Sequence, residues 1–365
     1  MLAALDARTD DPHFPGIGRY TRNLAHGLAR TEASSDELVL LGGRATRTAG
    51  RTRTAAVAAS PFSLRQQWMI PALLRRLGAH LYHSPYYLMP FRPRVACVVT
   101  IHDLIPMRFS QYFSTVQRAV YRLAVGRAVH AARLVIAVSE ATRRDIVSVL
   151  HLDPRRVVVV PEGVDPLFRP QAPPVIEALR RRLGVPDRYA LYVGSNKPHK
   201  NLVRLVDAWA AVRPEVPLVV AGPWDPRFPD ARRRGATLEA AGRIRWIGYV
   251  PDTDLPALYA GAACVVVPSE FEGFGLPVLE AMACGAPVAC ATTGSLPEVA
   301  GDAAALFDPF DTDAITTTVD ALLGDEAHRA ALAHRGLAHA ATFSWDAAAR
   351  QTWDVYRRAV GAERG

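Results

Sequence analysis

Short apolar runs alternate with stretches of helical periodicity along almost the whole chain. The runs are apolar throughout, which is typical of strands buried on both faces of a parallel sheet. Strands that alternate with helices predict an α/β fold with doubly wound parallel sheets. The predicted strands are Met1–Asp6, Leu38–Leu41, Val95–Ile101, Leu134–Val138, Val157–Val160, Tyr189–Val193, Leu218–Ala221, Ile244–Ile247, Cys264–Val267 and Val288–Ala291.

The length of 365 residues exceeds what one ordinary core supports, so two domains are expected. The proline-rich stretch Pro161–Pro174 predicts a linker, with the boundary near residue 170. The expected domains are residues 1–170 and 171–345, followed by a C-terminal helix over 346–365. The large or apolar residues that share one face of the final helical stretch are Trp345, Ala349, Trp353 and Tyr356.

The net charge of +8 fits an anionic ligand, an acidic membrane surface, or simply an arginine-rich composition. No Lys/Arg block of the type that binds nucleic acid occurs, so no nucleic-acid partner is expected. The four cysteines (Cys97, Cys264, Cys284 and Cys290) lie in apolar or small-residue surroundings without a CxxC pair, which predicts reduced thiols in a cytoplasmic protein.

The N-terminus lacks the basic region of a signal peptide. No apolar run approaches the roughly 18 residues of a membrane-spanning helix, so any membrane contact is expected to be peripheral. Oligomeric state is left open by the sequence.

Polar clusters follow several predicted strands, where open α/β sheets bind their ligands. One cluster, Gly16–Tyr20, is expected in a long loop after the first strand. His102 and Asp103 follow the strand that ends at Ile101, Gly194–Asn201 follows Val193, and Glu270–Glu280 follows Val267. A cleft between two domains would bring these clusters together.

The segment from Glu272 to Glu280 is the most informative. Two carboxylates bracket a Gly-Phe-Gly-Leu-Pro turn, and Pro277 is well placed to start a helix. Such a turn can present backbone N–H groups to a phosphate, while the carboxylates bind hydroxyls on either side. Phosphate flanked by hydroxyls describes a sugar nucleotide. The alternative is that Glu280 serves the helix dipole and that Phe274 and Leu276 are core residues.

The remaining candidates are less specific. Gly16 and Gly18 permit close approach to a ligand, but Thr21 interrupts a full GxGxxG pattern, and an ordinary loop is the alternative. His102 can hydrogen-bond a sugar hydroxyl or assist proton transfer, or it can be structural. Lys200, at a predicted helix start, offers a charge to a diphosphate, and Lys197 is a second candidate or a surface residue.

Three polar patterns are interpreted as helix caps. The two DxD sequences, Asp252–Asp254 and Asp311–Asp313, each precede a helical stretch, and Ser295–Glu298 matches a capping box. No His/Cys/Asp cluster has metal-ligand spacing, so no metal is expected.

The chain closely resembles the retaining GT-B glycosyltransferases of family 4. The resemblance implies two Rossmann-like domains facing across a cleft, with the sugar-nucleotide donor in the C-terminal domain and the acceptor in the N-terminal domain. The final helix of such proteins commonly returns to the first domain. The stretches that carry the resemblance are Gly16–Tyr20, Thr100–Pro106, Ala137–Glu140, Pro161–Asp165, Gly194–Asn201, Glu272–Glu280 and Gly294–Val299.

The resemblance also implies residue roles. Glu272 would contact hydroxyls of the donor sugar, and Glu280 would bind the ribose hydroxyls. Many members carry an arginine in the loop that begins at Gly194, where this chain has Ser195, Asn196 and His199 as candidates. The predicted catalytic residues are His102, Glu272 and Lys200. The predicted donor-binding residues are Gly16, Gly18, Gly194, Ser195, Lys200, Glu272, Gly273, Phe274, Gly275, Leu276 and Glu280.

The implied reaction retains the anomeric configuration without a separate metal or cofactor. Thr100–Pro106 and Gly194–Asn201 most resemble bacterial members that add mannose to surface polysaccharides, so GDP-mannose is the favoured donor and a UDP-sugar the alternative. The acceptor is expected to be a carbohydrate or a lipid-linked molecule, read by Phe62–Trp68, Tyr82–Pro90 and Met107–Phe113. A GT-B epimerase or phosphorylase and a non-catalytic sugar-nucleotide-binding protein remain alternatives.

Overall fold

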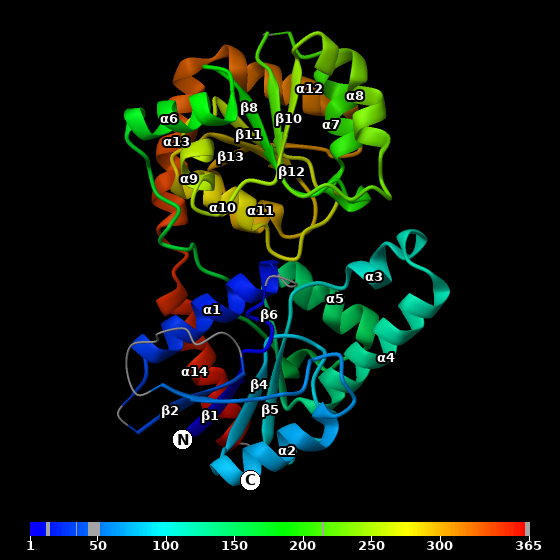
Figure 1. The fold of residues 1–365 in the computed structure, drawn as a ribbon, viewed down its shortest axis with the longest axis vertical. Helices are drawn as coiled ribbons and strands as arrows, with labels where there is room; N and C mark the ends of the chain where they lie inside the picture. Colours follow the sequence, from blue (N-terminus) through cyan, green and yellow to red (C-terminus); the bar gives the residue numbers. More distant parts are fainter. Residues whose placement is uncertain (12–14, 34, 43–51, 214, 362–365) are drawn as a thin grey trace. The chain divides into compact units, whose positions relative to one another are not determined.

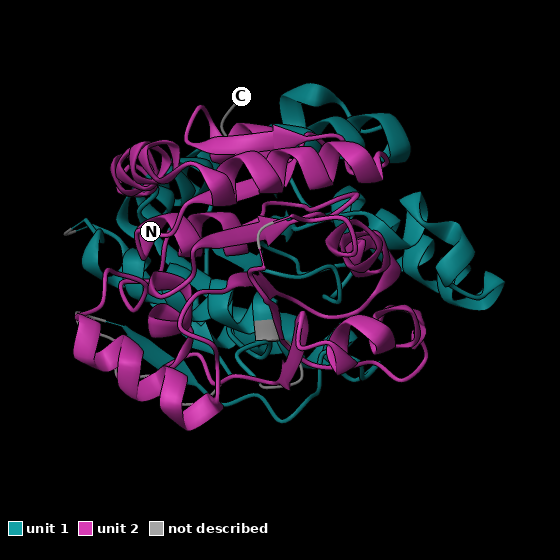
Figure 2. Cartoon of the chain, turned by 90° about the horizontal axis from the view of Figure 1, so that it is seen from above, with its two compact units in different colours: residues 1–163, 343–365 teal, residues 164–342 magenta. Residues whose placement is uncertain are grey.

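The computed structural model describes all residues except 12–14, 34, 43–51, 214 and 362–365. The chain forms two compact units: residues 1–163 with 343–365 make unit 1, and residues 164–342 make unit 2 (Figures 1 and 2). The boundary after Gly163 falls within the proline-rich stretch. Each unit is built around one parallel sheet, which confirms the predicted doubly wound α/β class.

The sheet of unit 1 has the strand order β3-β2-β1-β4-β5-β6-β7, and every adjacent pair is parallel. The strand order reverses between β1 and β4, so the switch point of the sheet lies at the carboxyl ends of these two strands. The strands are β1 (Leu2–Asp6), β2 (Glu37–Leu41), β3 (Arg53–Ala55), β4 (Leu81–Ser84), β5 (Ala96–Ile101), β6 (Leu134–Ala137) and β7 (Val157–Val159).

The final helix, α14 (Trp345–Gly361), belongs to unit 1 and packs against α1 (Pro15–Arg30). Its apolar face is buried, and the indole of Trp353 donates to the carbonyl oxygen of Leu28 at 3.2 Å. The other helices of unit 1 are α2 (Gln66–Leu77), α3 (Ile105–Arg108), α4 (Thr115–Ala131) and α5 (Glu140–Leu150).

The sheet of unit 2 has the order β10-β9-β8-β11-β12-β13, again entirely parallel, with its switch point between β8 and β11. The strands are β8 (Ala190–Val193), β9 (Leu218–Ala221), β10 (Ile244–Gly248), β11 (Cys264–Val267), β12 (Val288–Ala291) and β13 (Ala304–Phe307). The helices are α6 (Pro173–Leu183), α7 (Leu202–Trp209), α8 (Asp230–Ala240), α9 (Leu255–Ala260), α10 (Leu276–Ala283), α11 (Leu296–Ala300), α12 (Thr312–Gly324) and α13 (Glu326–Ala340).

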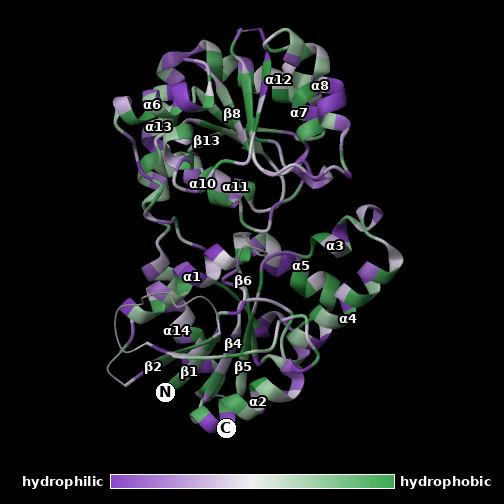
Figure 3. Cartoon of the chain, viewed as in Figure 1, coloured by the Kyte–Doolittle hydropathy of each residue, from purple (hydrophilic) through white to green (hydrophobic). Residues whose placement is uncertain are grey.

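All predicted strands are present, whereas β3, β4 and β13 were not predicted from the sequence. The interiors of both units are apolar, as the colouring of the central strands shows (Figure 3). The four cysteines are buried free thiols, and burial raises the pKa of Cys264, Cys284 and Cys290 to about 12. Among the helices of the described ranges, none combines the length and apolarity needed to cross a membrane.

The prediction that Gly16–Tyr20 lie in a long loop after the first strand is wrong. Gly16 and Gly18 lie in the first turn of α1 rather than in a loop. A Cβ atom at Gly18 would stand 2.9 Å from the backbone oxygen of Thr9, so this glycine lets the helix pack on the preceding segment. The buried stripe Tyr20, Leu24 and Leu28 anchors the helix and outweighs the low helix propensity of the two glycines.

Candidate active site

Most predicted donor residues of unit 2 lie on the two loops that leave its switch point, and Leu276 and Glu280 lie on the helix α10 that follows. The loop after β8 carries Gly194–Asn201, and the loop after β11 carries Ser269–Gly275. Because β8 and β11 are adjacent and parallel, their carboxyl ends deliver both loops to the same edge of the sheet. This topology explains why residues about seventy positions apart in the sequence meet.

Lys200 and Glu272 form a direct ion pair between these loops. The Lys200 Nζ atom lies 2.6 Å from Oε1 and 2.8 Å from Oε2 of Glu272, and the Ser269 hydroxyl donates to Oε1 at 2.7 Å. Burial alone would raise the pKa of the Glu272 carboxyl, but the charge and hydrogen bonds of Lys200 and Ser269 hold it below its ordinary value. Glu272 is therefore an ionised carboxylate in a largely buried position.

The glycine turn between Glu272 and α10 is fixed by a serine from another segment. Gly275 has a φ of +105°, a left-handed conformation that glycine adopts without strain. The Ser295 Oγ atom lies 2.6 Å from the backbone oxygen of Phe274 and 3.0 Å from that of Glu272. The predicted capping box at Ser295 is therefore wrong, because its side chain makes no cap hydrogen bond to α11 and holds the turn instead.

Glu280 lies on α10 and is only 5% exposed. The Tyr259 hydroxyl donates to its Oε2 atom at 3.0 Å, which fixes the carboxylate on the inner side of the helix. The carboxylate therefore has a defined orientation, separate from the ion pair of Glu272.

The loop that begins at Gly194 is held by its own polar residues. The Asn196 amide donates to the backbone oxygens of Asp225 and Phe228 at 2.8 and 2.7 Å, and the backbone oxygen of Ser195 accepts from Tyr192 at 2.7 Å. Burial and the charge of Lys200 lower the pKa of His199 to about 4. Lys197 is exposed, whereas Lys200 is partly buried, so the structure separates the two lysines that the sequence left as alternatives.

In unit 1, His102 follows β5 and lies between two acceptors. Its Nδ1 atom is 3.3 Å from the Glu162 carboxylate, and its Nε2 atom is 3.1 Å from the backbone oxygen of Pro85. The edge of Tyr20 packs on the imidazole ring, with ring centroids 4.6 Å apart. Glu162 was not predicted as a site residue, although its Pro-Glu-Gly-Val-Asp stretch was noted.

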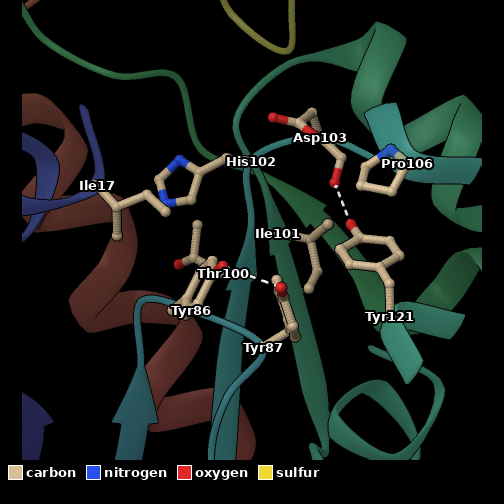
Figure 4. A pocket seen from close by; sticks show the side chains of 9 residues that line it. All are labelled: Ile17, Tyr86, Tyr87, Thr100, Ile101, His102, Asp103, Pro106 and Tyr121. Carbon is tan, nitrogen blue, oxygen red and sulfur yellow. Dashed lines mark hydrogen bonds between the residues drawn. The ribbon is translucent and has the colours of Figure 1, made fainter. Parts of the chain in front are cut away.

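A cavity of about 190 Å³ opens beside His102 at the switch point of unit 1. It is lined by α1, the segment after β4, the end of β5 and the two residues that follow it, together with residues of α3 and α4 (Figure 4). The lining residues are Ile17, Tyr86, Tyr87, Thr100, Ile101, His102, Asp103, Pro106 and Tyr121.

The two DxD sequences lie at helix starts. Asp311 caps α12 by accepting from the backbone N–H groups of Asp313 and Ala314. The predicted cap of α9 by Asp252 is wrong, because Asp254 occupies the N-cap position. Asp254 makes no side-chain cap bond and pairs with Arg182 at 2.7 Å. Within the described ranges, no group of three or more His, Cys, Asp or Glu side chains has the geometry to hold a metal ion.

Family models and relatives agree on one class. The model for glycosyl transferases group 1 matches residues 175–338, and the model for glycosyltransferase family 4 matches residues 15–167. The O-antigen chain mannosyltransferase B of Escherichia coli is 35% identical over 300 residues, covering 80% of this chain and 77% of that protein. A D-inositol 3-phosphate glycosyltransferase of Salinispora tropica is 33% identical over 313 residues, covering 78% and 65%.

Solved structures show the same fold. Sucrose-phosphate synthase from Thermosynechococcus elongatus superposes with a TM-score of 0.78 at 23% identity, covering 99% of this chain and 100% of that one. HepE from Anabaena, in complex with UDP-glucose, gives 0.77 at 21% identity, covering 98% and 100%. Fold and relatives together define a glycosyltransferase with the GT-B fold. The chain belongs to glycosyltransferase family 4, the glycosyl transferases group 1.

Proposed function

We propose that this enzyme transfers a hexose, with retention, from a nucleoside diphosphate sugar to a hydroxyl of a carbohydrate or lipid-linked acceptor. The observation that carries the proposal is the partly buried Lys200–Glu272 pair beside a glycine turn at the switch point of unit 2. Mannose from GDP-mannose is the favoured donor, supported by the similarity to a mannosyltransferase. A UDP-sugar is the alternative, supported by the UDP-glucose bound in HepE.

The two members of the pair would bind different parts of the donor. An ammonium group has three protons, so Lys200 can keep its contact with Glu272 and still donate to a diphosphate oxygen. The backbone amides of Phe274, Gly275 and Leu276, at the start of α10, would add donors for the same charge. Together they would stabilise the departing nucleoside diphosphate, while Glu272 binds the sugar hydroxyls.

The other predicted residues take supporting roles. Glu280, oriented by Tyr259, would accept hydrogen bonds from the ribose hydroxyls. His102 would lie near the transferred sugar. A front-face route, in which the leaving phosphate accepts the acceptor's proton, fits a Glu272 carboxylate already occupied by Lys200 and Ser269. No separate metal is invoked.

A thermal-shift panel with GDP, UDP, ADP and dTDP tests the donor site, because a ligand that binds only the folded state raises its stability. We expect the largest shift with GDP. The matching sugar nucleotide should then release its nucleotide in the presence of acceptor, with and without EDTA. The absence of a shift with all four nucleotides would contradict the proposed function. Donor hydrolysis or epimerisation as fast as transfer would favour the epimerase or phosphorylase alternative.

The acceptor class is open between the two relatives. One is named for an O-antigen chain and the other for D-inositol 3-phosphate. A polymer of sugars needs an uncharged binding site, whereas a phosphorylated cyclitol needs a site with positive charge. The charge of the residues next to His102 is therefore evidence for one acceptor class or the other.

A further inference from the structure

We propose that the cavity beside His102 takes an uncharged sugar unit of the acceptor and discriminates against acceptors that carry a phosphate at that unit. This assignment rests on the transferase activity proposed above. The cavity lies at the switch point of unit 1, and His102 forms part of its wall (Figure 4). Its position at the carboxyl ends of parallel strands is where open α/β sheets bind ligands.

The walls of the cavity are aromatic and fixed. The hydroxyls of Tyr86 and Tyr87 are 3.0 Å apart, and the Tyr121 hydroxyl donates to the backbone oxygen of Asp103 at 3.0 Å. The rings of Tyr87 and Tyr121 meet edge to face, with centroids 4.8 Å apart. Fixed aromatic rings with polar tips suit a pyranose, which has apolar C–H faces and a rim of hydroxyls.

The size of the cavity indicates a small occupant. Its volume of about 190 Å³ is below the roughly 300–1,000 Å³ of pockets for drug-sized ligands. A single sugar ring is therefore a better match than a nucleotide or a lipid chain. Longer acceptors would place one unit here and extend beyond it.

The charge of the cavity excludes an anion. None of its nine lining residues, all of which the structure describes, is a lysine or arginine. Asp103 lines it, with its Oδ1 atom accepting from the backbone N–H of Ile105 at 2.9 Å. The two ring nitrogens of His102 are directed at Glu162 and Pro85. A phosphate would therefore meet the Asp103 carboxylate and no lysine or arginine in the lining, which is unfavourable in a partly buried site.

The electrostatic effect of Asp103 reaches the aromatic walls. Burial raises the pKa of the Tyr86, Tyr87 and Tyr121 hydroxyls, and the negative charge of Asp103 raises each of them further. The three hydroxyls are consequently neutral and able to exchange hydrogen bonds with sugar hydroxyls.

The experiment compares matched pairs of probes on the full-length protein loaded with nucleotide. Methyl α-mannoside and inositol are the uncharged probes, and mannose 6-phosphate and inositol 3-phosphate are their charged counterparts. Saturation-transfer NMR and competition against transfer would report binding. We expect each uncharged probe to bind at least about tenfold more tightly than its phosphorylated counterpart, as one unpaired charge in a partly buried site predicts.

Variants test whether a preference for uncharged probes arises from this cavity. Asp103→Asn keeps an oxygen for the Ile105 N–H and should reduce the preference for uncharged probes severalfold. Tyr87→Ala should weaken all probes, whereas Tyr87→Phe should retain binding because it keeps the ring. Tyr249→Ala is the control, since this exposed tyrosine belongs to unit 2 and does not line the cavity.

The outcomes separate the two proposals. If nucleotides fail to stabilise the protein, the proposed function fails. If nucleotides bind and transfer occurs, but phosphorylated probes bind as well as uncharged ones or Asp103→Asn leaves their ratio unchanged, the cavity assignment alone is overturned.

Discussion

The ammonium nitrogen of Lys200 lies 2.6 and 2.8 Å from the two carboxylate oxygens of Glu272, across loops that leave two neighbouring strands. Neither residue is fully exposed, with 22% and 11% of their side-chain surfaces accessible. Removing one member of such a pair leaves a partly buried charge without its partner. The pair is therefore both a structural link between the loops and the proposed centre of donor binding.

Glu272→Gln should abolish most of the transfer activity. The amide keeps the shape but loses the charge that pairs with Lys200, so we expect kcat/KM to fall about 100-fold or more. The free energy of unfolding should fall by about 3 kcal/mol, as for other broken buried pairs. Nucleotide release and denaturant unfolding would measure both effects.

A neighbouring carboxylate provides the control. Glu270 lies on the same loop, and its backbone N–H donates to the backbone oxygen of His199 at 2.8 Å, a contact that a side-chain change leaves in place. Glu270→Gln should leave transfer within a few-fold of wild type. An equal loss of activity in both variants would contradict the role assigned to Glu272.

Ser295→Ala should loosen the glycine turn. The substitution removes the hydroxyl that lies against the backbone oxygens of Phe274 and Glu272, both in buried surroundings. Unsatisfied buried acceptors cost about 1–3 kcal/mol, so stability should fall by that amount and nucleotide affinity should fall with it. Thr316→Ala, which removes a hydroxyl that lies against the backbone oxygens of Thr312 in α12 and Ala208 in α7, should lower stability without changing nucleotide affinity. Unchanged nucleotide affinity in Ser295→Ala would contradict the prediction.

Glu280 should determine whether the enzyme distinguishes ribose from deoxyribose. A carboxylate that accepts from a ribose hydroxyl loses that contact with a 2′-deoxy nucleotide, at a cost of about 1.5–3 kcal/mol. Wild-type protein should therefore bind GDP at least about tenfold more tightly than 2′-deoxy-GDP, and Glu280→Gln should reduce this ratio. Tyr259→Phe, which removes only the hydroxyl at Oε2, should give an intermediate ratio. Calorimetric titration would measure all six affinities, and a ratio unaffected by Glu280→Gln would contradict the assignment.

The sequence predicts the sheets well because most of their strands are apolar on both faces. It misses β4 because Tyr82, His83 and Ser84 look polar, although each is at most 1% exposed. His83 is satisfied by Thr100 and Tyr356, from distant parts of the chain, and no local pattern contains that information. The same limit applies to the candidate site. Glu272 and Lys200 stand out by local motif, whereas Ser295 matches a capping box locally and is redirected to the turn by tertiary packing.

Two buried histidines should make the fold sensitive to acid. Burial lowers the pKa of His83 from 6.5 to about 3, and burial with the charge of Lys200 lowers that of His199 from 6.5 to about 4. In the unfolded chain these two histidines therefore bind protons near pH 6.5, whereas in the folded chain they bind protons only at a lower pH. The stability due to these neutral rings is complete above about pH 6.5 and is lost as the pH falls toward about 4 for His199 and about 3 for His83.

Denaturant unfolding at pH 7.5, 6.5, 5.5 and 4.5 should show this loss of stability. Below pH 4.5 a further loss is expected from Glu272, whose pKa is lowered in the folded protein. His83→Gln should be less stable at pH 7.5, because it gives up contacts with Thr100 and Tyr356, but its stability should depend less on pH between 6.5 and 4.5. The exposed His328 offers the control, and His328→Gln should reproduce the wild-type profile. A profile for His83→Gln that runs parallel to that of wild type would mean that the buried ring does not cause the acid sensitivity.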